Sequence, residues 1–273
     1  MNKNAAWYQS IRKVYYGMKE LPYNIRVAAD TYSIKKFKNI HKGETCFIVG
    51  NGPSMKVEDL DRIHQLGIKS FACNKIYKIF PETSWRPEYY LSSDDKIIEQ
   101  LDVKKIGIPA EHMFFPRTYK DKIKMGNFYE LLSYRWLEEG KFSQDAHKGI
   151  YQCGTILAEA MQFAFYMGFS TVYIIGVDFN YFFKSQDESH QTYRYNGENN
   201  YFIKDYLMPG EVANIPDKAA NILGFEAARK GFELENRHIY NATRGGLLEV
   251  FERKNLDQVF EELQYHMEKS VSV

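Results

Sequence analysis

The sequence predicts an α/β protein built on a doubly wound, mostly parallel β-sheet. Two observations lead to this prediction. Short apolar runs alternate along the chain with amphipathic stretches of helical spacing, which is typical of successive strand–helix–strand units. The chain has 273 residues, 44% of them hydrophobic and 26% charged, which is enough to bury one core without disulfides or metal ions.

The first predicted strand is the apolar run 45–50, which ends in the turn Asn51-Gly52-Pro53-Ser54. Apolar residues then recur at helical spacing over 57–66, and Gly67 ends that helix. A strand, a tight turn and a helix in this order are the opening unit of a Rossmann-like sheet.

The clearest predicted helix is 154–167, which stops at Gly168 and is followed at once by a central strand at 171–179. Another helix begins with Asp217 as its cap and ends near residue 231. Further strands are predicted at 69–74, 88–94 and 238–243.

The stretch 181–216 fits neither the helical nor the strand period. It is rich in Tyr, Asn, Asp and Glu, and is longer than the roughly 15 residues beyond which a structureless loop usually has a function. It also follows a strand end, where open α/β sheets bind their ligands. We therefore predict that 181–216 is a lid within a nucleotide-binding domain of residues 44–273.

Residues 1–43 differ in charge from the rest of the chain. They carry nine basic and two acidic residues, whereas the whole chain is nearly balanced at 36 basic and 35 acidic residues. We predict a basic, helical N-terminal arm without which the domain folds. It either associates peripherally with an anionic membrane surface or packs on the acidic body or a second subunit, as in a homo-oligomer.

The composition excludes several classes of protein. The balanced charge excludes a generally cationic nucleic-acid binder, and no apolar run approaches the roughly 18 residues of a membrane-spanning helix. The N-terminus has no apolar core of a signal peptide. Cys46, Cys73 and Cys153 are far apart in short apolar runs, so we expect buried, reduced thiols in a cytoplasmic protein.

The turn after the first strand is the sharpest local motif. Gly50 and Gly52 allow a tight turn and a close approach to a ligand, and Ser54 can cap the following helix, whose N-terminus favours an anion. The motif lacks the Gly-Lys-Ser/Thr of a P-loop and the spacing of GxGxxG. Taken alone, it indicates either a phosphate loop or an ordinary strand–helix turn.

Two further polar residues end predicted strands. Asn74 and Asp94 are therefore expected at the same sheet edge as the turn, where they could bind a ribose or a base edge, although Asn and Asp are also common in turns. Asp59 and Asp61 match the Asp-x-Asp pattern of a glycosyltransferase metal motif. They lie in a predicted helix, however, where we expect them on a solvated face. The sequence predicts no metal site.

Four segments occur in a characteristic order: 48–56 (IVGNGPSMK), 71–77 (FACNKIY), 151–169 (YQCGTILAEAMQFAFYMGF) and 172–181 (VYIIGVDFNY). Together they resemble two related bacterial groups. These are the CMP-sialic acid-dependent sialyltransferases and the 6-hydroxymethylpterin pyrophosphokinase-like family, which includes domains of motility accessory glycosyltransferases.

The resemblance implies a nucleotide site. The turn residues would hold the CMP phosphate and ribose, Asn74 would contact the nucleotide, and Cys153 stands where the sialyltransferases have a nucleotide-binding serine. Tyr181 would replace their phosphate-binding tyrosine. The nucleotide-binding residues expected are Gly50, Asn51, Gly52, Ser54, Asn74, Asp94, Cys153, Gly154, Asp178 and Tyr181.

The general base is where the sequence departs from the sialyltransferases. Their lid histidine has no counterpart in 199–206, which leaves His190 and Asp205 as candidates, with Asp205 favoured by position. Lid tyrosines such as Tyr201, with the helix N-terminus after the turn, would stabilise the leaving phosphate.

The function implied is transfer of sialic acid or a related nonulosonic acid from a CMP-sugar to a cell-surface glycan, without a cofactor. The partners are then the sugar donor and the glycan acceptor. One alternative is a pterin-type pyrophosphokinase that uses ATP and Mg²⁺, for which Asp94, Asp95 and Asp178 are the available carboxylates. The other is a nucleotide-binding protein without catalysis.

Overall fold

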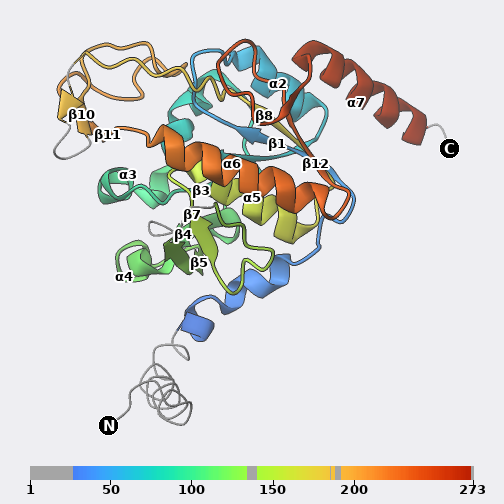
Figure 1. Ribbon diagram of the computed structural model, residues 1–273, viewed down its shortest axis with the longest axis horizontal. Helices are drawn as coiled ribbons and strands as arrows, with labels where there is room; N and C mark the ends of the chain where they lie inside the picture. Colours follow the sequence, from blue (N-terminus) through green and yellow to red (C-terminus); the bar gives the residue numbers. More distant parts are fainter. Residues whose placement is uncertain (1–26, 134–139, 185, 188–191, 272–273) are drawn as a thin grey trace, which may run out of the picture.

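The computed structural model describes residues 27–133, 140–184, 186–187 and 192–271. Its centre is an eight-stranded sheet in the order β13-β12-β8-β1-β2-β3-β4-β5, in which every pairing is parallel. The predicted α/β, Rossmann-like fold is confirmed (Figure 1). The strands are β1 (Thr45–Val49), β2 (Lys69–Cys73), β3 (Tyr89–Leu91), β4 (Met113–Pro116), β5 (Asn127–Tyr129), β8 (Thr171–Ile175), β12 (His238–Asn241) and β13 (Glu252–Arg253).

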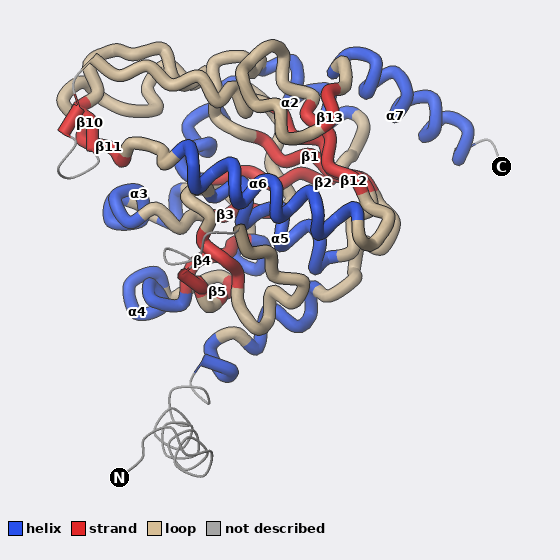
Figure 2. Tube along the Cα trace, in the orientation of Figure 1, coloured by secondary structure: helices blue, strands red, loops and turns tan. Residues whose placement is uncertain are grey.

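Helices cover both faces of this sheet (Figure 2). On β1, Cys46 and Ile48 face the core cluster that contains α5 (Ile156–Met167) and α6 (Lys218–Glu233). The alternate β1 residues face the cluster that contains α2 (Val57–Gln65) and α7 (Leu256–Val271). Burial on both faces explains why the central strands are continuous apolar runs.

Shorter elements connect these layers. Two more α-helices, α3 (Asp95–Gln100) and α4 (Lys120–Ile123), lie near the end of the sheet that β3, β4 and β5 form (Figure 1). A separate parallel pair is formed by β6 (Leu131–Ser133) and β7 (Ile150–Gln152). The 3₁₀ segments are Tyr32–Phe37, Asn74–Glu82, Val103–Lys105, Ala110–His112 and Arg117–Tyr119.

The predicted lid has a fold of its own. Within 181–216, the strands β9 (Gln186–Asp187), β10 (Thr192–Arg194) and β11 (Val212–Asn214) form an antiparallel sheet. Tyr193 on β10 is only 2% exposed. The lid is joined to the first turn because the N–H of Phe202 donates to the carbonyl oxygen of Asn51 at 3.1 Å.

The described part of the N-terminal segment packs into the body. Ile34 and Phe37 are buried in the same core cluster as α5, and the carboxylate of Asp30 pairs with Lys120. The N–H of His41 donates to the carbonyl oxygen of Met167 at the end of α5 at 2.8 Å. The apolar side chains of this part complete the core, and the expectation that the domain folds without residues 1–43 stays a prediction.

Among the residues that the structure describes, no helix is both long and apolar enough to cross a membrane. The same residues place no group of three or more His, Cys, Asp or Glu side chains where they could hold a metal ion. All three cysteines are free and buried, as expected from their apolar surroundings.

Candidate functional site

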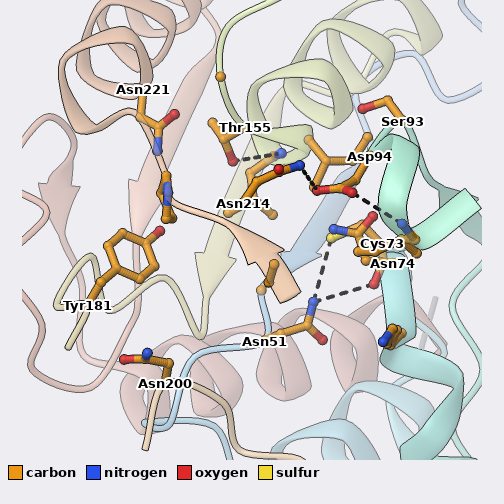
Figure 3. Close-up of a pocket in the computed structure, with 18 of the residues that line it drawn as sticks. Asn51, Cys73, Asn74, Ser93, Asp94, Thr155, Tyr181, Asn200, Asn214 and Asn221 are labelled. Atoms are coloured by element: carbon orange, nitrogen blue, oxygen red, sulfur yellow. Dashed lines mark hydrogen bonds between the residues drawn. The ribbon is translucent and has the colours of Figure 1, made fainter. Parts of the chain in front are cut away.

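A cavity of about 1000 Å³ lies between the lid and the carboxyl ends of β1, β2, β3 and β8. The chain leaves β1 toward β2 on one side and continues through β8 and β12 on the other, so the cavity is at the point where the strand order reverses. Open α/β sheets bind ligands at this position. In Figure 3, Asn51 and Asn200 lie on one side of the pocket, across from Ser93, Asp94 and Thr155.

The two glycines of the first turn are required by contact with β8. The N–H groups of Gly50 and Gly52 donate to the carbonyl oxygens of Ile175 and Gly176 at 2.8 and 2.9 Å. A Cβ atom at position 50 would lie 2.8 Å from the carbonyl carbon of Gly176, and one at position 52 would lie 2.7 Å from its oxygen. Both glycines line the pocket, but their close approach is to the protein's own backbone.

Ser54 holds Asp178 and does not cap α2. Its hydroxyl donates to Oδ2 of Asp178 at 2.8 Å, and its N–H points to the same oxygen at 3.4 Å. The cap of α2 is Lys56, whose N–H donates to Asp59. Ser54 is absent from the pocket lining, whereas Asp178 is part of it.

Asp59 also differs from its predicted role as part of a solvated helix face. It is 2% exposed, and its carboxylate accepts a hydrogen bond at 2.6 Å from Arg244, which follows β12. This ion pair holds the N-terminal end of α2 to the β12 loop, so Asp59 is a structural residue.

The asparagines that follow β1 and β2 both line the pocket. The Asn51 amide nitrogen donates to the carbonyl oxygen of Cys73 at 3.4 Å, while its Oδ1 is buried and accepts no hydrogen bond from the residues described. Asn74 has a left-handed backbone with φ of 57°, and its Oδ1 accepts from Ser92 at 3.2 Å. The predicted meeting of strand-end residues at one sheet edge is confirmed.

This backbone conformation determines the variant that tests Asn74. Asn74→Gly keeps the left-handed backbone accessible and removes the amide, so we expect weaker nucleotide binding with little loss of folding stability. Asn74→Ala should also destabilise the protein by about 1–2 kcal/mol, because L-residues other than Asn and Gly are disfavoured there. Urea unfolding and calorimetric titration with CMP measure the two effects. Unchanged CMP affinity in Asn74→Gly would limit Asn74 to a turn role.

Asp94 links β3, α3 and the lid. Its carboxylate accepts from the N–H of Ile97 at 3.2 Å, which caps α3, and from the amide of Asn214 on β11 at 3.3 Å. The same amide reaches Asp95 at 3.3 Å. Burial raises the pKa of Asp94, although its hydrogen bonds oppose this shift. Both carboxylates are therefore already engaged by protein groups at the rim of the pocket.

The sequence matches the model of one known protein family. A sequence model described as 6-hydroxymethylpterin diphosphokinase MptE-like matches residues 18–184. The chain belongs to this MptE-like family. A solved MAf glycosyltransferase from Magnetospirillum magneticum AMB-1 is similar with 14% identity and a TM-score of 0.49, over 85% of this chain and 38% of that one. No curated protein matches. The predicted membership of the pterin-kinase-like group is confirmed.

Two adjacent residues of this MptE-like chain, Cys153 and Gly154, were expected to bind a nucleotide, but only Gly154 lines the pocket. Gly154 lines the pocket with φ of 68°, close to Asn221 on α6. Cys153 is 1% exposed and packs against Gly224, and its thiol lies 3.5 Å from the carbonyl oxygen of Tyr151. Because Cys153 is not among the lining residues, it supports the pocket wall from behind and is not placed to touch a nucleotide.

Two tyrosines that line the pocket keep their hydroxyl groups neutral. Burial raises the pKa of Tyr181 to about 12 and that of Tyr201 well above its ordinary value. The Tyr201 ring stacks on Tyr206 at 4.0 Å between centroids, and its hydroxyl lies 3.1 Å from that of Tyr193. Tyr181, Tyr201 and Tyr206 line the pocket, so hydroxyl donors are available on the lid side.

The structure does not place Asp205, the favoured base, in the pocket. Asp205 is exposed and absent from the pocket lining, and its backbone oxygen accepts from Lys78. The assignment of Asp205 as the base is wrong for this arrangement, because the neighbouring Tyr206 and Leu207 are buried and Asp205 faces outward. His190 lies outside the described residues.

The residue that the motifs missed is Glu159 on α5. It lines the pocket, is 1% exposed, and accepts hydrogen bonds from Ser93 at 2.9 Å and from Tyr129 at 2.5 Å. Burial raises its pKa to about 7, and the two hydrogen bonds oppose the shift. A signal was present in the sequence, because Glu159 is the charged residue within the otherwise uncharged run 154–167.

Proposed function

We propose that this protein is a glycosyltransferase that moves sialic acid or a related nonulosonic acid from a CMP-sugar to a glycan acceptor without a metal ion. One observation carries the proposal: neutral carboxamides and hydroxyls are the most numerous polar side chains of the pocket, with seven of each among the described lining residues against six carboxylates and two lysines. Carboxamides both donate and accept hydrogen bonds, which suits a base edge and sugar hydroxyls. Among the described residues, the six lining asparagines are Asn51, Asn74, Asn180, Asn200, Asn214 and Asn221.

The charged groups of the pocket favour a ligand with little phosphate charge. Among the described lining residues the cations are Lys75 and Lys96, and Lys75 is 5% exposed and paired with Glu211. The loop amide of Ser54, which would face a phosphate in a P-loop, points to Asp178 instead. A CMP-sugar, with one phosphate, needs fewer cations than a nucleoside triphosphate.

The chemistry would be displacement of CMP by an acceptor hydroxyl. As the bond between the sugar and the phosphate breaks, negative charge grows on the phosphate oxygen. Tyr181 and Tyr201, whose hydroxyls stay protonated, could donate to that charge. The nine basic residues of 1–43 would bring a cytoplasmic enzyme to the anionic inner face of a membrane, where lipid-linked glycans are built.

The family description supports one alternative, a pterin diphosphokinase that uses ATP and Mg²⁺. The carboxylates that the sequence offered for its metal are Asp94, Asp95 and Asp178, all of which line the pocket. Asp178 accepts from Ser54, and Asp94 accepts from Ile97 and Asn214, so a metal would compete with these contacts. This competition favours the transferase.

A thermal-shift panel of CMP, CDP, UDP, GDP and ATP, each with and without Mg²⁺, tests the proposal. We expect CMP to raise Tm without metal, with a stabilisation of about 2.7 kcal/mol at 100 times its Kd. Release of CMP from a CMP-sugar in the presence of a glycan acceptor would then show transfer. A Tm increase confined to ATP with Mg²⁺ would favour the diphosphokinase, and CMP binding without transfer would indicate a non-catalytic nucleotide-binding protein.

A further inference from the structure

The buried carboxyl of Glu159 lies behind a hydroxyl that faces the pocket. Oε1 accepts from the Ser93 hydroxyl at 2.9 Å, and Oε2 accepts from the Tyr129 hydroxyl at 2.5 Å. Glu159 is 1% exposed, whereas Ser93, at the end of β3, is half-buried. Both residues line the cavity, and Ser93 is the more exposed of the two. Tyr129 fixes the carboxyl from the opposite oxygen.

This part of the pocket lies opposite the first turn and the lid residue Asn200 (Figure 3). Ser93 and Thr155 lie across the pocket from Asn51 and Asn200 (Figure 3). The neighbouring lining residues supply neutral hydroxyl and amide groups suited to an acceptor with several hydroxyls. We call this set the acceptor side: Ser93, Thr118, Tyr119, Gln152, Thr155 and Glu159.

The groups that face Glu159 come from several elements and are largely neutral. Tyr129 on β5 has a pKa well above its ordinary value. Cys73 at the end of β2 and Cys153 after β7 feel the charge of Glu159, and burial raises the pKa of each thiol to about 12. These thiols and the phenol stay protonated at neutral pH. Glu159 is therefore the group of this cluster that changes its protonation near pH 7.

We propose that Ser93 and Glu159 form a proton relay in which Glu159 receives the proton of the acceptor hydroxyl, an inference that rests on the proposed transferase function. The acceptor O–H bond breaks while its oxygen bonds to the anomeric carbon of the donor. That proton moves to Oγ of Ser93, and the proton of Ser93 moves to Oε1 of Glu159. The bond from the anomeric carbon to the phosphate breaks, CMP leaves with the electron pair, and Glu159 later releases its proton to solvent.

The relay predicts a characteristic pH dependence. Glu159 must be ionised to accept a proton, so kcat/KM should rise as pH increases through about 7 and then level off. The hydrogen bond from Tyr129 lowers the pKa of Glu159. Tyr129→Phe should therefore move this limb to higher pH, a shift that a purely structural carboxyl would not produce.

The decisive comparison is Glu159→Gln against Glu159→Asp in the full chain. Glu159→Gln should lower kcat/KM by about 100-fold or more while CMP still binds, because general acid–base catalysis contributes on this scale. Glu159→Asp, which keeps a carboxyl, should retain part of the activity and the rising limb. Ser93→Ala should resemble Glu159→Gln, and Ser93→Thr should keep transfer.

A readout without turnover checks that Glu159 titrates where the relay requires. Folding raises its pKa from 4.5 to about 7, so the folded state holds the extra proton between these values. The unfolding free energy of the parent protein should thus fall as pH rises across this window, and Glu159→Gln should lack this contribution.

The outcomes separate the relay from the function on which it rests. Full transfer by Glu159→Gln, or joint loss of CMP binding and transfer in that variant, would overturn the relay while leaving the transferase intact. A parent protein that neither binds CMP nor transfers from any CMP-sugar would remove the proposed function, and the relay with it.

Discussion

Replacing Gly50 with alanine should lower the free energy of unfolding by about 3 kcal/mol, the upper part of the range for overpacked positions. The added Cβ would overlap the carbonyl oxygen of Gly176 and lie 2.8 Å from its carbon and 3.2 Å from the oxygen of Ile175. All three atoms are backbone, so no side chain can turn away. Relief requires separation of the first turn from the end of β8, where Gly50 donates to Ile175.

Gly67→Ala is the matched control for this prediction. Gly67 has φ of 60° with no atom within 4 Å of an added Cβ, so its substitution introduces backbone strain without overlap. We expect a loss of about 1 kcal/mol there. Urea unfolding of both variants measures the difference. If Gly50→Ala cost no more than Gly67→Ala, the first turn would not be held against β8, and the pocket would be less firmly built than its contacts indicate.

The sequence predicted the strands β1, β2, β3, β8 and β12. In β1 and β2 every residue after the first is buried, so their sequences differ from the helical period. The elements that were not predicted include β5 and β6, each three residues long. A segment of that length gives no measurable periodicity, so only the assembled sheet defines it.

The site was predictable to the extent that chain topology decides it. Asn74 and Asp94 were placed correctly because parallel strands end at one edge of the sheet. Ser54 was misassigned as a cap because its partner Asp178 is distant in sequence. Asp205 lies outside the pocket because it is in a turn, closed by the N–H of Tyr206 donating to the carbonyl oxygen of Ile203 at 3.2 Å, that leaves Asp205 exposed and Tyr206 buried. Local patterns carry no information about such long-range partners.

Phe37→Ala should destabilise the protein by about 3–5 kcal/mol, the usual cost of removing a buried phenylalanine. Phe37 is 5% exposed, and its ring contacts those of Phe114 and Tyr89 edge-on, with centroids 4.9 and 6.1 Å apart. Because Phe114 lies on β4 and Tyr89 on β3, the substitution would open a cavity against the central sheet. A fall of this size is measurable by urea unfolding at neutral pH.

Ile40→Ala is the control for Phe37→Ala. Ile40 belongs to the same basic segment 1–43 but is much more exposed than Phe37, so the comparison isolates the effect of burial. Ile40 is 45% exposed, so we expect a loss of about 0.5 kcal/mol, as for other surface substitutions. The charge of 1–43 is the same in both variants, and only the packed area differs. A large loss in Phe37→Ala alone would show that this segment completes the core beside β3 and β4. Equal, small losses would mean that the segment is an appendage, as its charge alone suggested.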